Sequence, residues 1–295
     1  MSFEVSRNRY TRLRELRRLH PERDHHAIYR ASALYEFPFD TRLGLLLAFW
    51  RTFAVPSIAE LLDDTGETTK RTRKRADDTG ILMYELIDHG PDDPRGRTAI
   101  RRLNQMHRRF AITNEEYLYV LGTFIFVPNR WIDRHGWRPL CCHERAASFH
   151  FYREVGRRMN IREIPARYAD FETFFDDFER TRFGYSPAGA RLISATKGLL
   201  ATFPAPLVPA GRALADALLD PTVRHATGVA EPTRLTTTAL RAALAARGWW
   251  LRHQPPRQLS RLADGIHTRT YPDGYDLAEV GTAAANHPGR DEPAP

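Results

Sequence analysis

Apolar residues recur along most of the chain at intervals of three and four residues, the spacing of one face of an α-helix. The strict alternation of apolar and polar residues that is typical of a β-strand is hardly present, and no repeat period is found. We therefore predict an all-α fold, a single compact helical bundle. The predicted helices lie at residues 5–35, 42–53, 57–66, 68–88, 96–110, 113–127, 142–159, 168–182, 188–201, 210–219 and 234–253.

Local signals refine some of these boundaries. Thr113 is followed by a glutamate three residues later, the pattern of a capping box, and the helix that it opens is apolar nearly all round. We expect that helix to be buried at the centre of the bundle. Ser57 with Glu60 predicts a second capping box, and the tryptophan-rich stretch 129–139 is predicted to be a connection.

Two predicted helices carry polar side chains on faces that otherwise belong to the core. Arg75 and Thr79 share the face of helix 68–88 that holds its leucines, and His107 shares an apolar stripe of helix 96–110. Polar groups on a buried face are costly unless something satisfies them, and a ligand or cofactor between the two helices would do so. A histidine on an apolar face is more often a hydrogen-bonded core residue, so the pattern indicates a site without naming its ligand.

Composition permits a sizeable core, because 42% of the residues are hydrophobic and 16 are phenylalanine. The formal net charge of +8 makes anionic partners possible, and arginine-rich stretches at 71–75 and 101–109 could contact nucleic acid. The arginines are spread over every predicted helix, however, and no helix-turn-helix with a polar recognition helix is found. We therefore predict no nucleic-acid partner.

The two cysteines, Cys141 and Cys142, are adjacent, so they do not form an ordinary disulfide with each other. No CxxC motif and no apolar leader are found, and the longest apolar runs, 43–50 and 117–128, are too short to span a bilayer. We therefore expect a cytoplasmic protein without a transmembrane segment.

Several long segments together resemble the MpaB/rubber-oxygenase family, which includes the latex-clearing proteins. The similarity runs from about residue 30 to about residue 280 and is carried by FPFD, RTFAVPSIAELLDDTGE, KRADDTGILMYELIDHG, GRTAIRRLNQMHRRFAITNEEYLYVLGTFIFVPNRW, HGWRPL, FHFYREVGRRMNIREIP and YPDGY. On this basis we divide the chain into an N-terminal charged helical segment (1–30), a catalytic domain (31–282) and a tail predicted to be disordered (283–295).

The resemblance implies an all-α fold that encloses a b-type haem, with dioxygen used to attack an isoprenoid or other lipophilic carbon skeleton. Latex-clearing members cleave carbon–carbon double bonds to carbonyl products. The MpaB-type members, to which this sequence looks nearer, are linked to oxidative cleavage of a prenyl chain. The implied partners are a lipophilic small molecule and dioxygen.

The family's functional residues can be placed on this chain one at a time. Its proximal haem ligand is a histidine about thirty residues after an Arg-x-x-x-Thr motif. Arg75 and Thr79 supply that motif, and His107 follows 28 residues after Thr79. The resemblance thus makes His107 the expected iron ligand. It places Arg75 near the distal face or a propionate and Thr79 near bound oxygen or a distal water; ordinary helix packing is the alternative for both.

One position departs from the family pattern. Latex-clearing proteins have a lysine just before the motif threonine, able to occupy the distal side of the iron, whereas this chain has Asp78. We therefore do not expect a lysine-ligated closed state, and polyisoprene itself is in doubt as the substrate. Asp78 could act as an acid or base near the distal pocket, or form an ion pair with Arg75 or Lys74.

Alternatives remain for several other residues. His150, between two phenylalanines, is the rival iron ligand. Arg101 and Arg102 could reach the propionates, although a solvated charged face is the more common role. The aromatic residues that could line a lipophilic channel, or simply pack in the core, are Phe124, Phe126 and Trp131.

The type of oxygenase reaction depends on which other redox features the sequence contains besides the predicted haem. No cysteine-thiolate signature, electron-transfer domain or nucleotide fingerprint is found, which disfavours a scheme like that of cytochromes P450. A dioxygenase that needs no external electrons is favoured over a monooxygenase with a separate reductase. The alternative function is a non-catalytic haem- or lipid-binding protein of the same fold.

Overall fold

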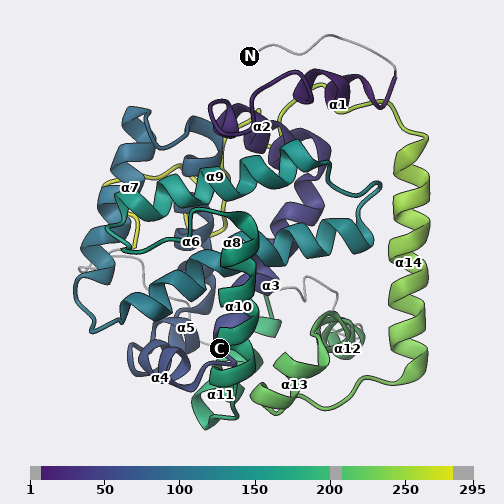
Figure 1. The fold of residues 1–295 in the computed structure, drawn as a ribbon. Coiled ribbons are helices and arrows are strands. Elements are labelled where there is room, and N and C mark those ends of the chain that lie inside the picture. Colours follow the sequence, from purple (N-terminus) through teal and green to yellow (C-terminus); the bar gives the residue numbers. More distant parts are fainter. Residues whose placement is uncertain (1–7, 200–207, 282–295) are drawn as a thin grey trace.

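Helix α8 runs through the middle of a molecule made of packed helices (Figure 1). The computed structural model describes residues 8–199 and 208–281, and within these residues it contains helices and no strand, which confirms the predicted all-α fold. The elements are α1 (Thr11–Leu16), α2 (His25–Ala31), the π-helical turn η1 (Ser32–Glu36), α3 (Pro38–Thr52), α4 (Pro56–Asp64), α5 (Glu67–Lys70), α6 (Thr72–His89), α7 (Pro94–His107), α8 (Asn114–His135), α9 (Cys142–Arg158), α10 (Tyr168–Arg182), α11 (Pro187–Lys197), α12 (Val208–Leu218), α13 (Pro221–Thr227) and α14 (Arg234–Arg252).

Helix α8 is central because its sequence is apolar on nearly every side. The predicted capping box at its start is confirmed: the Thr113 hydroxyl accepts from the Glu116 backbone N–H, and the Glu116 carboxylate accepts from that of Thr113. Helix α3 packs along α8 so closely that a Cβ on Gly44 would lie 2.6 Å from the Pro128 Cα. This packing holds α8 together through Pro128, so the connection predicted at 129–139 was wrong in its first part: the helix continues to His135, and the connection to α9 begins at Gly136.

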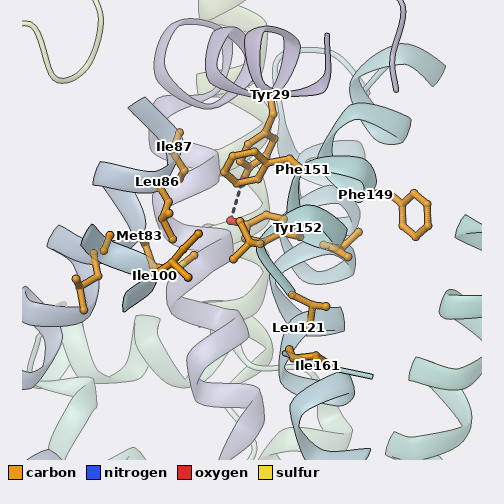
Figure 2. Packing of buried hydrophobic residues seen from close by; sticks show 14 of the residues in the cluster. Tyr29, Met83, Leu86, Ile87, Ile100, Leu121, Phe149, Phe151, Tyr152 and Ile161 are labelled. Atoms are coloured by element: carbon orange, nitrogen blue, oxygen red, sulfur yellow. Dashed lines mark hydrogen bonds between the residues drawn. The ribbon is translucent and has the colours of Figure 1, made fainter. Parts of the chain in front are cut away.

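The largest hydrophobic cluster lies between α6, α7, α8, α9 and α10, with α2 closing one side. Figure 2 shows the rings of Tyr29 and Phe151 stacked in it, with a hydrogen bond of 2.9 Å between the hydroxyls of Tyr29 and Tyr152. A second cluster joins the end of α3, around Trp50 and Phe53, to α11, α12 and α13. Burial of this many large side chains is the main source of stability of the bundle.

The N-terminal segment is not the continuous helix that periodicity predicted for 5–35. Helix α1 ends at Leu16 and α2 begins at His25, with turns around Pro21 between them, because proline lacks the N–H that an interior helical residue donates. Ile28 and Leu16 are buried together with Ala147 of α9. The division at residue 30 stays a prediction, and the tail predicted at 283–295 lies outside the described residues.

Several other boundaries shift for local reasons. The helix predicted at 57–66 begins at Pro56, so Ser57 lies inside it and its hydroxyl donates to Glu116 (2.6 Å); no capping box forms there. Helix α13 was not predicted, although Asp220 caps it and Gly228 follows its end at a φ of 67°. The helices predicted at 68–88 and 96–110 are shorter, since α6 starts at Thr72 and α7 ends at His107.

After α14 the chain returns across α6 and α7 without forming a helix. We call residues 253–281 the C-terminal strap. Its Leu277 and Val280 are buried in the main cluster, and the Arg102 Nε donates to the Val280 carbonyl (2.7 Å). Among the described residues, no single helix is long and apolar enough to cross a membrane; α3 and α4 reach that length and hydropathy only when counted together, across a 96° bend.

Candidate functional site

Helices α6 and α7 form a hairpin whose turn depends on two glycines. Gly90 ends α6 at a φ of 83°, and a Cβ on Gly96 would lie 1.8 Å from the Gly90 carbonyl oxygen. Asp93 caps α7 by accepting from the Arg95 backbone N–H, and Pro94 takes its first position. The turn fixes how α7 lies beside α6, and with it where His107 lies relative to Arg75.

His107 is the last residue of α7, and its ring is oriented by its own helix. Nδ1 lies 2.8 Å from the Leu103 carbonyl oxygen, which can only accept, so Nδ1 carries the ring hydrogen. Nε2 then holds a lone pair, and it has no hydrogen-bond partner within residues 8–199 and 208–281. Desolvation lowers the pKa of His107 below 6.5, and the charge of Arg75 lowers it further, so the ring is neutral at pH 7.

The guanidinium of Arg75 is held by a neutral side chain, the hydroxyl of Thr79. Its Nη1 donates to the Thr79 hydroxyl, which in turn donates to the Arg75 carbonyl (2.9 Å). In the described parts of the chain, no carboxylate forms an ion pair with it. Arg75 keeps some accessible surface, yet enough protein surrounds it that desolvation lowers its pKa. The charges of Asp78 and Glu67 act in the opposite direction, but desolvation is the larger cause, so the guanidinium is only partly compensated.

Apolar side chains surround these polar groups. The Phe49 ring centroid lies 5.8 Å from the Arg75 guanidinium carbon, and the Tyr117 ring lies edge-on to His107 with centroids 5.8 Å apart. Tyr117, Val120 and Phe124 form one stripe of α8 and stay partly exposed. The other two predicted channel residues, Phe126 and Trp131, are buried in the core, so of the three aromatics only Phe124 shares this partly exposed stripe.

Asp78 is engaged elsewhere. It accepts from Lys74 Nζ (2.8 Å) and from the Tyr271 hydroxyl of the strap (2.5 Å). Of the two ion pairs expected for it, the structure forms the one with Lys74. Two turns further along α6, Glu85 accepts from the Tyr275 hydroxyl (2.5 Å). Both tyrosines belong to YPDGY, a motif whose role the sequence did not indicate: it fastens the strap to α6.

The remaining candidates lie away from the site. His150 on α9 is half-exposed and lines a surface hollow with Glu22, His25 and charged residues of α9, although its neighbours Phe149 and Phe151 are buried. Arg101 is exposed, as a solvated face requires, but Arg102 is buried and also donates to Gln105 (3.0 Å). The expected solvated role is therefore wrong for Arg102, because the strap covers it.

The donor set of the described residues bears on which metal could be held here. No group of three or more His, Cys, Asp or Glu side chains is placed to hold a metal ion in residues 8–199 and 208–281. A single imidazole with a free Nε2 suits a metal that arrives with its other ligands already in place, as the iron of a haem does. Arg75 suits a propionate carboxylate, and the stripe of Tyr117, Val120 and Phe124 on α8 suits a flat apolar macrocycle.

The matching family model and two similar proteins all belong to one group of oxygenases. Residues 40–252 match the family model described as "ER-bound oxygenase mpaB/B'/Rubber oxygenase, catalytic domain". ER-bound oxygenase mpaB' of Penicillium brevicompactum is 26% identical over 255 residues, which are 80% of this chain and 60% of that protein. ER-bound oxygenase mpaB of Penicillium roqueforti is 30% identical over 170 residues, 52% of this chain and 57% of that protein. The chain thus matches less than two thirds of the length of either relative.

Proposed function

Because the chain belongs to the mpaB/B'/rubber oxygenase family, whose matched part is an oxygenase catalytic domain, we propose that it is a haem b-dependent oxygenase. The proposed substrate is lipophilic, an isoprenoid or prenylated compound, and the proposed reaction is oxidative cleavage of a carbon–carbon double bond. A dioxygenase reaction is favoured over a monooxygenase reaction. The cytoplasmic location stays a prediction.

The observation that carries this proposal is a neutral imidazole, His107, close enough to Arg75 to be affected by its charge, while Arg75 forms no ion pair with any described carboxylate. Taking a guanidinium out of water without a carboxylate is unfavourable, so a bound anion would offset that cost. Haem brings both a metal for Nε2 and propionate carboxylates for a cation. When bound, it would supply the iron at which dioxygen is activated.

The chain's own residues have separable roles in this proposal. The Leu103 carbonyl holds the His107 ring in the tautomer that presents Nε2. Thr79 holds the Arg75 guanidinium in place and so fixes its positive charge. Phe49, Tyr117 and Phe124 keep water away and give an apolar substrate a surface to contact.

The first test is an absorption spectrum of the purified protein expressed with haem supplied. We expect a Soret band in the parent that is lost or strongly weakened in His107→Ala, because an alanine cannot bind iron. His150→Ala is the matched control, since it removes a histidine at the surface, and its spectrum should equal that of the parent. Absence of haem in the parent would overturn the cofactor assignment, and an unchanged band in His107→Ala would overturn the ligand.

A second assay separates the oxygenase from the alternative, a non-catalytic haem- or lipid-binding protein. Dioxygen uptake is followed with prenylated olefins, and products are analysed for carbonyl groups. Uptake with carbonyl products supports the oxygenase. Haem binding without uptake on any olefin tested would favour the alternative.

A further inference from the structure

Helix α14 lies at one edge of the molecule (Figure 1). Only one side of this helix packs against the rest of the bundle. Leu244 and Gly248 are its buried residues, and they face the body of the bundle. The opposite side carries Leu235, Ala239, Ala242, Ala246 and Trp249, spaced by four and three residues and all exposed. This spacing places them on a single stripe, which we call the outer stripe of α14.

The outer stripe is unusually apolar for a surface. Leu235 is 80% exposed and Trp249 is 64% exposed, and Trp250 beside it is 54% exposed. Leu259, just after the helix, is 70% exposed. Large apolar side chains gathered on one exposed face mark a binding surface more often than single scattered ones do.

Charge decides what kind of partner fits. Residues 232–263 contain six arginines and no aspartate or glutamate. Three of them, Arg234, Arg241 and Arg252, are exposed and lie seven and eleven residues apart, so they form a row on the flank of α14 between its buried side and the outer stripe. Within the described residues none of the three forms an ion pair, although the Arg252 Nε donates to the Trp137 carbonyl (2.6 Å).

We propose that the outer stripe of α14 docks on the surface of a bilayer that contains anionic lipid. An amphipathic helix with tryptophans at one end of its apolar face and a row of arginines beside it can bury the apolar side chains among the acyl chains. The arginines then lie at the level of the anionic headgroups, and the indoles at the interface that they favour.

A second copy of this chain fits the same face less well. In a two-fold dimer the stripe would pack on itself, and each row of arginines would meet a helix that offers no carboxylate. The proposal does not depend on the proposed oxygenase activity or on haem, because it uses none of the site residues.

Flotation of the purified full chain with lipid vesicles tests the proposal. We expect it to float with vesicles of phosphatidylcholine mixed with phosphatidylglycerol, less with phosphatidylcholine alone, and less again when salt is raised. The double variant Trp249→Ser/Trp250→Ser should bind the mixed vesicles about tenfold more weakly or worse, because two indoles no longer enter the interface. Tyr185→Ser, which changes an aromatic residue of 61% exposure away from α14, is the matched control and should bind as the parent does.

A charge variant tests the arginine row without touching the apolar residues. Arg234→Gln/Arg241→Gln should bind the mixed vesicles more weakly and lose part of the salt dependence, while its weak binding to phosphatidylcholine stays the same. The proposal is overturned if the parent does not float, or if the double tryptophan variant floats as the parent does. It is also overturned if size-exclusion chromatography shows a dimer that the tryptophan variant abolishes while vesicle binding stays unchanged.

Discussion

His107 owes its proposed role to the two nitrogens of one ring. Nδ1 is held by the Leu103 carbonyl, and Nε2 is left without a partner among the described residues. Burial keeps the ring neutral, which a metal ligand requires. The charge of Arg75 acts on this ring, and in the part of the chain that the structure describes no carboxylate forms an ion pair with that guanidinium. Each residue alone would be unremarkable in a helical core; together they are the reason for proposing a haem here.

The ionisation of His107 gives a prediction with a definite sign. Its pKa in the haem-free protein should lie below 6.5, because desolvation disfavours the charged ring. The unfolded chain then takes up the proton first, so the free energy of unfolding falls as pH drops from 6.5 through the lowered value, and haem retention falls in the same window. NMR titration of the ring measures this pKa.

Arg75→Gln serves as the control for that titration. It removes one of the two causes that lower the pKa of His107, so the value should rise but stay below 6.5, since desolvation is the larger cause. A pKa of 6.5 or above in the parent would contradict the burial described for this ring.

Two arginines of neighbouring helices should respond oppositely to the same substitution. Arg75→Met should leave the free energy of unfolding of the haem-free protein unchanged or raise it, because the lost cation has no described carboxylate partner. It should weaken haem retention by about tenfold or more, since a charge-assisted contact is lost.

Arg102→Met should lower the free energy of unfolding by about 1–3 kcal/mol, because the Val280 carbonyl loses its donor. Urea titrations and haem transfer to apomyoglobin measure the two quantities; a clear loss of stability in Arg75→Met would show that the cation is already paired.

At the scale of elements, the α6–α7 hairpin is the part of the fold that the site depends on most. Its turn needs Gly96 close to the Gly90 carbonyl, and its outer face needs the strap, whose tyrosines bind Asp78 and Glu85. Of the residues on α6, Arg75 and Thr79 lie on one face, and Asp78 and Glu85, which fasten the strap, lie on another.

A pair of glycine substitutions tests the hairpin. Gly96→Ala should lower the free energy of unfolding by about 3 kcal/mol or more, because its Cβ would overlap the Gly90 carbonyl oxygen and force the turn apart. Gly80→Ala is the matched control within α6. A Cβ there meets nothing within 4 Å, so the change should be neutral or stabilise the protein by about 0.5–1 kcal/mol through helix propensity. Equal effects of the two changes would show that the turn tolerates a wider geometry.

The strap can be tested without changing the residues that it covers. Tyr271→Phe/Tyr275→Phe removes two hydroxyls that donate to carboxylates while keeping both rings. We expect the free energy of unfolding to fall by about 1–2 kcal/mol, and hydrogen exchange to become faster in residues 253–281 but not in α14. Unchanged exchange in the strap would mean that Leu277 and Val280 alone hold it in place.

At the scale of the whole molecule, the sequence predicted those features that depend on residues close together in the chain. The period of apolar residues identified most of the helices, the capping box placed the start of α8, and three polar residues on apolar faces pointed to the hairpin that also carries the family motif. Contacts between distant residues were beyond such patterns. Tyr271 and Asp78 are 193 residues apart, and no local rule indicates that one binds the other. The burial of Arg102 and the continuation of α8 through Pro128 depend in the same way on segments that pack against them from elsewhere in the chain.

The hydrogen bond from His107 to its own helix has an electronic consequence. The Leu103 carbonyl lies in the last turn of α7, where the helix dipole concentrates partial negative charge. Such an acceptor draws the hydrogen of Nδ1 away from the ring, which makes Nε2 a stronger electron donor. A metal bound there would be stabilised in its higher oxidation state. Its reduction potential would therefore be lower than with a histidine that lacks this hydrogen bond.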